Sequence, residues 1–390
     1  MSKVQLKGIT WDHSRGYTPL VAASQRYHEL HPDIEITWTK RTLQEFADFP
    51  IEKLAESFDL LVIDHPWVGY ASALSTVHPL DLLIDGEVLN RLAENSVGAS
   101  YFSYQYEGHL WALPIDAATP VASYRSDLLE ENGMELPVTW QDVLAIARTG
   151  RVAAPGIEVD LLMNFYMFCN ATGDAPFKSP DCIVPGETGI MALEAMREFY
   201  ALLHPDFFHC NPIAVAEKMT SSDNFFYCPF AYGYSNYSRA GYAKSLLNYT
   251  DLVSYAGKLL NSTLGGTGLS ISVFSKQPTI AADFSAWVAG ENIQRTLYTL
   301  NGGQPGHRAA WLSSVNNAIT HQYFMNTIPA LDRAFVRPRY AGYLQFQDRA
   351  GLPLQQYLQH GGNPSLVLDQ MNDMYRQSRR FKNTFSKSYA

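Results

Sequence analysis

Two short clusters of polar and aromatic residues carry the side chains best suited to chemistry. The first cluster is Trp11-Asp12-His13-Ser14-Arg15, and the second is Asp64-His65-Pro66-Trp67. Ionised carboxylates accept hydrogen bonds and imidazole rings donate or accept them, which suits the hydroxyl groups of a small polar ligand. An indole face packs against the C–H groups of a sugar ring, so Trp11 and Trp67 are predicted to be apolar platforms.

Each cluster directly follows a predicted β-strand. Residues 3–11 form an extended run without proline, and residues 60–63 are the continuous apolar run Leu-Leu-Val-Ile that a parallel sheet buries on both faces. Helical segments and a strand that includes Ile34, Ile36 and Trp38 lie between them, which predicts a parallel sheet with right-handed crossovers. The carboxyl ends of parallel strands meet at one edge, where ligands bind in α/β folds, so both clusters are predicted to line one site.

Capping signals place the helices between these strands. Thr18-Pro19 predicts a helix start, with an N-cap residue followed by proline, and His31-Pro32 predicts its end. Thr42 and Glu45 have the spacing of a capping box, which predicts a second helical stretch that breaks at Pro50 and resumes through Leu54.

Other roles compete with ligand binding for these residues. The two tryptophans could pack in a core, and Asp12 and Asp64 could cap the helices that follow them. Two Asp-His pairs could also hold a metal, but adjacent residues do not easily turn both side chains to one ion, so no metal is predicted. His13 and Arg15 indicate that the ligand could be an anion such as a carboxylate, phosphate or sulfonate, with a surface or bridging Arg15 as the alternative.

Composition limits the class of protein. A chain of 390 residues exceeds what one hydrophobic core usually supports, so two lobes are expected. The formal net charge of -9 argues against nucleic acid as the main partner, because phosphate binding needs a basic surface. The four cysteines match no zinc spacing, and we predict mostly free thiols.

Membrane and export signals are missing from the sequence. It contains no run of eighteen apolar residues, and residues 1–3 lead into the first strand without the apolar segment of a signal peptide. We therefore expect either that a signal has been removed or that the chain lacks one.

The remainder of the chain predicts a second lobe and a return to the first. Residues 109–116 form a short strand-like segment before a small-residue stretch, where we predict a crossing between lobes. Thr139 is expected to cap a helix in a largely helical region, and the aromatic segment 225–234 is expected to be a strand plus loop because Pro229 and Gly233 would break a helix. Residues 264–273 predict a glycine turn and an alternating strand that returns to the first lobe. After this strand we predict a helix over 278–288. The final part of the chain is predicted to be mostly helical, with a proline turn at 337–340.

These segments, taken in order, resemble the sugar-type (family 1) extracellular solute-binding proteins of ABC importers over nearly the whole chain. The motifs that carry the resemblance are residues 8–11, 58–67, 108–114 leading to 124–128, 137–140, 265–272 and 281–288. The order and spacing of these motifs along the chain carry the resemblance.

The resemblance implies an α/β, two-lobed periplasmic-binding-protein-like fold of type II with a hinge between the lobes. Residues 1–114 and 265–312 would form the N-terminal lobe, and residues 115–264 and 313–390 the mostly helical C-terminal lobe. Ligand contacts to both lobes would favour the closed state. Residues expected to bind the ligand are Trp11, Asp12, His13, Arg15, Asp64, His65, Trp67, Asp116, Tyr232, Tyr234, Asn236, Gly266, Thr267 and Arg339. Arg337, on the same proline turn as Arg339, is ambiguous between a cleft and a surface position.

The resemblance also implies a non-catalytic receptor that delivers a sugar, polyol or sugar acid to an ABC permease. The expected protein is a periplasmic monomer without a cofactor, with the cytoplasm as the alternative compartment. Two other functions stay open. A glycoside hydrolase would need paired carboxylates at a fixed separation, and a cytoplasmic sensor would use the same fold to report ligand to a partner.

Overall fold

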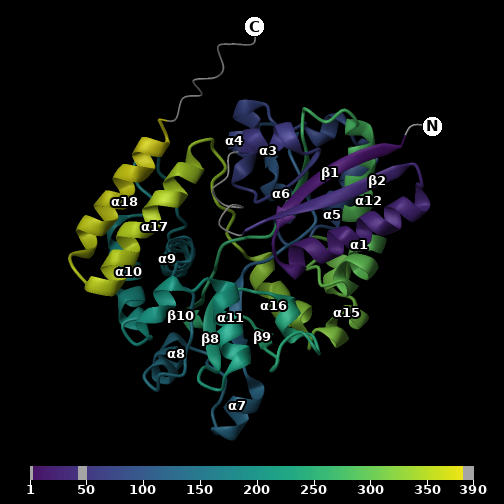
Figure 1. Cartoon of the computed structure of the whole chain (residues 1–390). Helices are drawn as coiled ribbons and strands as arrows, with labels where there is room; N and C mark the ends of the chain where they lie inside the picture. Colours follow the sequence, from purple (N-terminus) through teal and green to yellow (C-terminus); the bar gives the residue numbers. More distant parts are fainter. Residues whose placement is uncertain (1–2, 43–50, 381–390) are drawn as a thin grey trace.

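The computed structural model describes residues 3–42 and 51–380 of the chain (Figure 1). Two separate β-sheets organise it, each covered by helices. The first sheet lies among α1, α3, α4 and α12, whereas α10, α17 and α18 lie together on the opposite side of the molecule.

The first sheet has five strands in the order β2-β1-β3-β12-β6. Their bounds are Val4–Trp11 for β1, Ile34–Arg41 for β2, Leu60–Ile63 for β3, Leu113–Pro114 for β6 and Gly268–Ile271 for β12. β1 pairs in parallel with both β2 and β3, which confirms the parallel arrangement predicted for the first sixty residues. β12 returns to this sheet as predicted and runs antiparallel to its neighbours β3 and β6. All four β12 residues are buried instead of alternating, because a central strand is covered on both faces.

Helices cover this sheet, and the first of them begins earlier than predicted. Their bounds are Ser14–Leu30 for α1, Ile51–Ser57 for α3, Trp67–Leu74 for α4, Gly86–Glu94 for α5, Ser100–Ser103 for α6 and Pro278–Ala289 for α12. The predicted start of α1 at Thr18 is wrong: His13 is extended and its side chain accepts a hydrogen bond from the Arg15 backbone N–H, so the helix begins at Ser14 and includes Pro19. Most of the helical stretch predicted from Thr42 lies outside the described residues.

The second sheet has three antiparallel strands in the order β8-β7-β9. β7 spans Pro120–Tyr124, β8 spans Tyr227–Tyr232 and β9 spans Asn248–Thr250. The helices around it are α7 Ser126–Glu131, α8 Trp140–Ala147, α9 Glu158–Thr172, α10 Gly186–Tyr200, α11 Pro212–Ser221, α16 Tyr323–Asp332, α17 Tyr343–His360 and α18 Pro364–Ser378. Thr139 caps α8 in a full capping box with Asp142, as predicted.

Smaller elements complete the fold. Two short hairpins pair β4 Gln105–Tyr106 with β5 His109–Leu110, and β10 Ser254–Tyr255 with β11 Lys258–Leu259. Helices α14 Arg308–Trp311 and α15 Ser314–Ile319 lead to α16, and a π-helical stretch spans Gln294–Tyr298.

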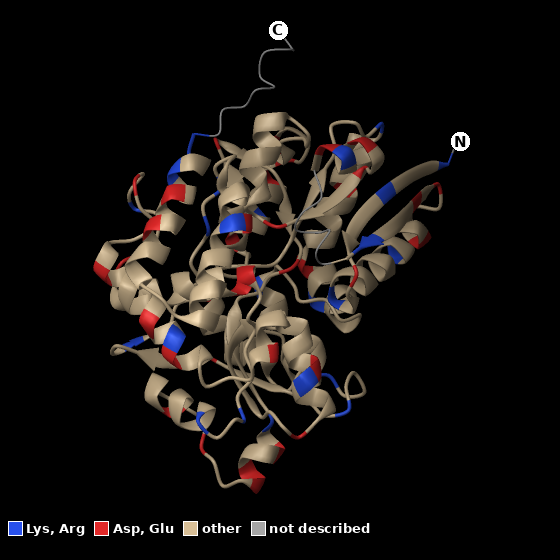
Figure 2. Cartoon of the chain, turned by 60° about the vertical axis from the view of Figure 1, so that its left-hand side comes forward, with Lys and Arg blue, Asp and Glu red and all other residues tan. Residues whose placement is uncertain are grey.

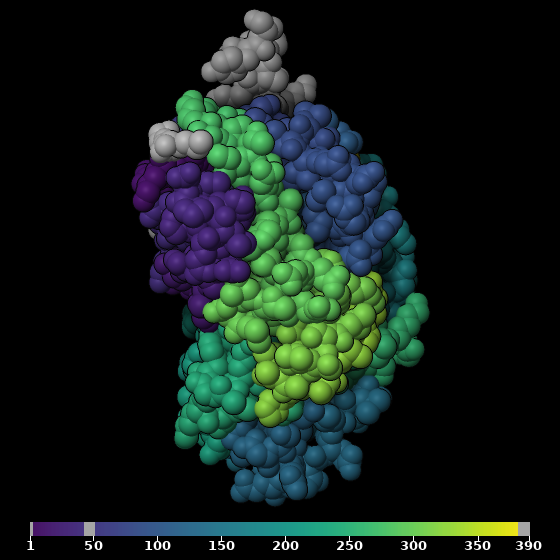
Figure 3. Space-filling view, turned by 90° about the vertical axis from the view of Figure 1, so that its right-hand side faces the viewer, coloured from purple at the N-terminus to yellow at the C-terminus, as the bar shows by residue number. Residues whose placement is uncertain are grey.

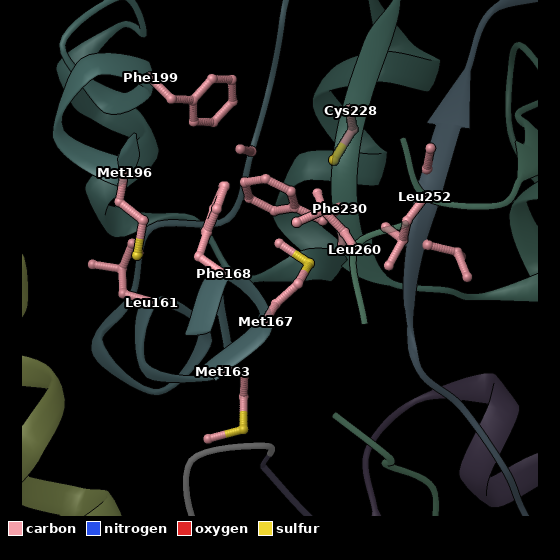
Figure 4. Packing of buried hydrophobic residues seen from close by; sticks show 14 of the residues in the cluster. Leu161, Met163, Met167, Phe168, Met196, Phe199, Cys228, Phe230, Leu252 and Leu260 are labelled. Atoms are coloured by element: carbon pink, nitrogen blue, oxygen red, sulfur yellow. The ribbon is translucent and has the colours of Figure 1, made fainter. Parts of the chain in front are cut away.

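Buried apolar side chains form two clusters. The first core contains buried residues between Leu6 and Ile115 and between Leu269 and Tyr298, and the second contains Val97 together with residues between Ala117 and Leu264 and between Trp311 and Tyr375. In the second core, rings from α9, α10 and β8 meet (Figure 4), with Phe168 and Phe199 both packed against Phe230. The chain therefore crosses between the cores near residues 115–120 and 264–268. The lobe boundaries assigned from the sequence stay a prediction.

Three further properties of the described chain concern its charged residues, its cysteines and the apolar character of its helices. Lys and Arg are interspersed with Asp and Glu over the described chain, without a stripe of one sign (Figure 2). All four cysteines are free, as predicted. No helix of the described residues is both long and apolar enough to cross a membrane.

Candidate functional site

Three aspartates follow strand ends at one edge of the first sheet. β1 and β3 are parallel, and Gly268 of β12 pairs with both Ile63 and Pro114, so β1, β3 and β6 all end at this edge. Asp12, Asp64 and Asp116 come directly or nearly directly after these ends. The predicted convergence of strand ends is therefore present in the structure.

Arg15 and Asp116 form a buried ion pair at this edge. Arg15 Nε lies 2.8 Å from Asp116 Oδ2, and Nη2 bonds the other carboxylate oxygen. Nη1 donates to the carbonyl of Gly233, which follows β8 of the second sheet, at 3.0 Å. Burial opposes the charge of Arg15, but Asp116 raises its pKa above the ordinary value. Arg15 therefore ties α1 to the crossing segment and to the end of β8.

The first turn of α1 contacts the segment after β8 through further polar groups. The Ser14 hydroxyl lies 2.9 Å from the Tyr242 hydroxyl, and His13 Nε2 lies 3.3 Å from the same oxygen. The Asn236 amide donates to the Gly302 carbonyl and to Ser14 Oγ. Tyr234 packs its ring against both His13 and the Arg15 guanidinium. Because burial and then Arg15 lower the pKa of His13 to about 4, this histidine is neutral near neutral pH.

A second ion pair lies at the end of β3, between the buried Arg337 and the partly exposed Asp64. Arg337 Nη2 donates to both oxygens of Asp64, at 2.6 and 2.8 Å, and Nη1 donates to Gln347 of α17. Burial disfavours the Asp64 charge, yet Arg337 and His65 together lower the pKa of Asp64 to about 2. His65 is almost fully buried, and burial followed by the Arg337 charge lowers its pKa to about 4.

Both ion pairs lie at one edge of the first sheet, after the ends of β3 and β6, which both pair with Gly268. Tyr104 donates to the Ile63 carbonyl at this edge, and burial raises its pKa, with the charges of Asp64 and Asp116 contributing to the shift.

Gly266 and Thr267 lie beside Asp116, in the segment that leads the chain back into β12 of the first sheet. Backbone N–H groups and carbonyls of Asp116 and Thr267 bond each other in both directions. Gly266 has a φ of +98°, and a Cβ there would lie 2.3 Å from the Asp116 carbonyl oxygen, so only glycine fits this close approach.

The two predicted tryptophan platforms lie in different environments. Trp11 is 4% exposed within the first core, and its indole covers Gly16 so closely that a Cβ there would lie 2.4 Å from the ring. This is the core packing that the sequence left as the alternative. Trp67 is the first residue of α4, is half-buried, and packs edge-on against Tyr70.

Three more predicted residues have partners other than the four residues of the two ion pairs. Asp12 is about half exposed and pairs with Lys40 at 2.7 Å. The Tyr232 hydroxyl bonds Thr263, with its ring against Gly265. Arg339 donates to the carbonyls of Phe102 and Gln105, and its guanidinium covers the Phe102 ring.

Sequence reasoning missed two residues that complete the site, Tyr242 and Tyr104. It considered a third, Arg337, but did not count it among the expected ligand residues. The proline turn at 337–340 was the one local signal, whereas nothing near Tyr242 or Tyr104 in the sequence points to the strand ends.

Several buried polar atoms of the site have no hydrogen-bond partner among the described residues. These atoms are His65 Nε2, Thr267 Oγ1, Asn236 Oδ1 and Arg337 Nε. Near these atoms, the start of α1 contacts the segment after β8 directly, through Ser14 with Tyr242 and Arg15 with Gly233. A cavity of about 450 Å³ lies elsewhere, between β1, β2 and α3, and none of its lining residues belongs to the predicted site.

The sequence matches a family model described as bacterial extracellular solute-binding protein over residues 10–295, which is more than two thirds of the chain. The chain belongs to this family. The sheet edge that carries Asp12, Asp64 and Asp116 lies within the residues that the family model matches.

Solved structures of low sequence identity share the fold of this solute-binding protein. A maltose-bound MalE3 of T. maritima is 17% identical with a TM-score of 0.82, and the match covers 96% of this chain and 99% of that one. A solute-binding protein of Agrobacterium radiobacter in complex with ribitol is also 17% identical, with a TM-score of 0.81 and coverage of 96% and 99%. These matches confirm the two-lobed periplasmic-binding-protein-like fold. Figure 3 shows the green residues after β12 between the purple N-terminal residues and the blue first-lobe residues at the upper right, with teal and blue second-lobe residues at the bottom.

A curated relative matches over a shorter stretch. The maltotriose-binding protein of Pyrococcus abyssi is 26% identical over 108 residues, which are 28% of this chain and 23% of that protein. This chain therefore matches about a quarter of that relative's length.

Proposed function

We propose that this solute-binding protein captures a carbohydrate-like solute, a sugar, polyol or sugar acid, in the cleft between its lobes. We further propose that it delivers the solute to the membrane subunits of an ABC importer outside the cytoplasm. The related structures bound to maltose and ribitol support a ligand of this class. The two ion pairs and the contacts of α1 with Tyr242 support a site that both lobes build.

One observation carries the proposal most strongly: buried polar atoms without partners lie on segments of both lobes, His65 in the first and Asn236 in the second. The Nδ1 atom of His65 lies 3.2 Å from Asp64, so the proton of this neutral ring is best placed there and Nε2 is an acceptor. Asn236 Oδ1 also accepts, and Thr267 Oγ1 can do either. Leaving such groups unsatisfied costs about 1–3 kcal/mol each. Hydroxyl groups both donate and accept, so a polyhydroxylated solute suits all of them.

A thermal-shift screen tests this proposal. The panel contains ribitol, D-mannitol, D-tagatose, maltose and maltotriose, each with chromatography of the compound before and after incubation. At least one compound is expected to raise the Tm by several degrees without being consumed, because a ligand at 100 times its Kd stabilises the folded state by about 2.7 kcal/mol. If no compound raised the Tm, the proposal would lose its basis, and consumption of a stabilising compound would indicate an enzyme.

A further inference from the structure

Asp160 is a buried carboxyl group without a partner. It lies in the first turn of α9 and is 6% exposed. Its Oδ2 atom is fully buried and has no hydrogen-bond partner, and no ion pair involves Asp160 in the part of the chain that the structure describes. Burial alone raises the pKa of Asp160 to about 7. A buried carboxyl normally has hydrogen-bonding partners, so this one requires an explanation.

The position of Asp160 places it beside the predicted site. Val152 pairs in parallel with Tyr227 at the start of β8, so the chain enters α9 toward the same end of the second sheet at which β8 ends. Burial raises the pKa values of Tyr232 and Tyr234, and the charge of Asp160 contributes to both shifts. Asp160 therefore acts on Tyr232, the last residue of β8, and on Tyr234 just beyond it.

Two charged pairs of the site are compensated, because Arg15 pairs with Asp116 and Arg337 pairs with Asp64. The buried atoms without partners include the acceptors His65 Nε2, Asn236 Oδ1 and Asp160 Oδ2, and the donors Arg337 Nε and, on Arg239, Nε and Nη2. A hydroxyl group would supply the donor that the Asp160 carboxylate lacks, whereas an anionic group beside it would add a like charge.

We propose that Asp160 binds the ligand, with its carboxylate accepting hydrogen bonds from hydroxyl groups of a sugar or polyol. This inference rests on the proposed function and assigns one ligand residue to α9.

Proton release on binding is the expected signature. Hydroxyl donors favour the ionised carboxylate, so ligand binding lowers the pKa of Asp160 and releases a proton near neutral pH. The titratable groups on which the charge of Asp160 acts are Tyr200 of α10, Cys228 and Tyr232 of β8, and Tyr234. Their pKa values are all raised, so these groups are uncharged at this pH and do not supply the proton.

Isothermal titration calorimetry with D-mannitol, ribitol, D-tagatose and maltose tests the inference. Titrations in two buffers of different ionisation enthalpy at pH 6.5 measure the protons released. The unaltered protein is expected to release a substantial fraction of a proton with at least one probe. Asp160→Asn, similar in size and uncharged, is expected to bind that probe at least tenfold more weakly and without proton release. Glu158→Gln makes the same change of charge in the same turn of α9 and is expected to alter neither quantity.

The outcomes separate the two proposals. If Asp160→Asn bound the probe as tightly as the unaltered protein, or if the unaltered protein bound it without releasing protons, Asp160 would not be a ligand residue although the proposed function would stand. If the unaltered protein bound no probe, the proposed function would fail, and this inference with it.

Discussion

Replacement of Arg15 by methionine is expected to lower the free energy of unfolding by about 3–5 kcal/mol, because the change leaves Asp116 charged and buried without its partner. Asp116 is 1% exposed, and both of its oxygens bond Arg15. The variant also removes the bond to the Gly233 carbonyl that ties α1 to the second lobe. Urea unfolding at pH 7 measures the loss.

Two further variants show whether the ion pair is the cause. Arg15→Met combined with Asp116→Leu removes both charges and is expected to regain most of the stability, since a buried pair exchanged for apolar residues is often neutral or stabilising. Arg26→Met, in the exposed pair of the same helix with Glu29, is expected to leave the unfolding curve unchanged. A loss in Arg15→Met no larger than in Arg26→Met would show that the pair contributes little.

Acidification is expected to destabilise the protein between pH 6.5 and pH 4 through its buried histidines. The pKa of His65 is about 4 in the folded state against an ordinary 6.5, so the unfolded state binds more protons in this window. The His65 contribution to the free energy of unfolding is complete above pH 6.5 and is lost as the pH decreases, with a loss of about 3 kcal/mol at pH 4. His13 adds a second contribution in the same window.

The pH dependence of the free energy of unfolding isolates this effect. His65→Asn is expected to remove roughly half of the decrease between pH 7 and pH 4. His204→Asn, at a side chain that is 63% exposed, is expected to leave the decrease unchanged. Equal pH profiles for His65→Asn and the unaltered protein would contradict the assignment of a neutral buried His65.

The position of the sheet edge could be predicted from the sequence, whereas the ion pairs formed by its residues could not. Strand β3 could be predicted because four consecutive apolar residues are followed by Asp64, and the chain order then placed Trp11, Asp12 and Asp64 at one edge. The ion pair between Asp64 and Arg337 could not be predicted, since 273 positions separate the two residues and only the folded chain brings them together.

Burial was the second property that local patterns could not supply. Trp11 ends a strand next to polar residues, and its position alone indicated a ligand platform. The structure buries it because Gly16, with no side chain, lets the start of α1 pack directly on the indole. The early start of α1 has a similar cause, because the His13 side chain is a less familiar N-cap than Thr18, and it is an acceptor here only as the neutral ring.

Amide hydrogen–deuterium exchange with and without a compound from the thermal-shift panel that raises the Tm tests most directly whether the ligand binds between the lobes. Binding between the lobes predicts slower exchange in two segments together, residues 64–67 of the first lobe and residues 232–242 of the second. Slower exchange confined to one lobe, or located around the cavity lined by Ile9, Lys40 and Phe58, would contradict binding between the lobes.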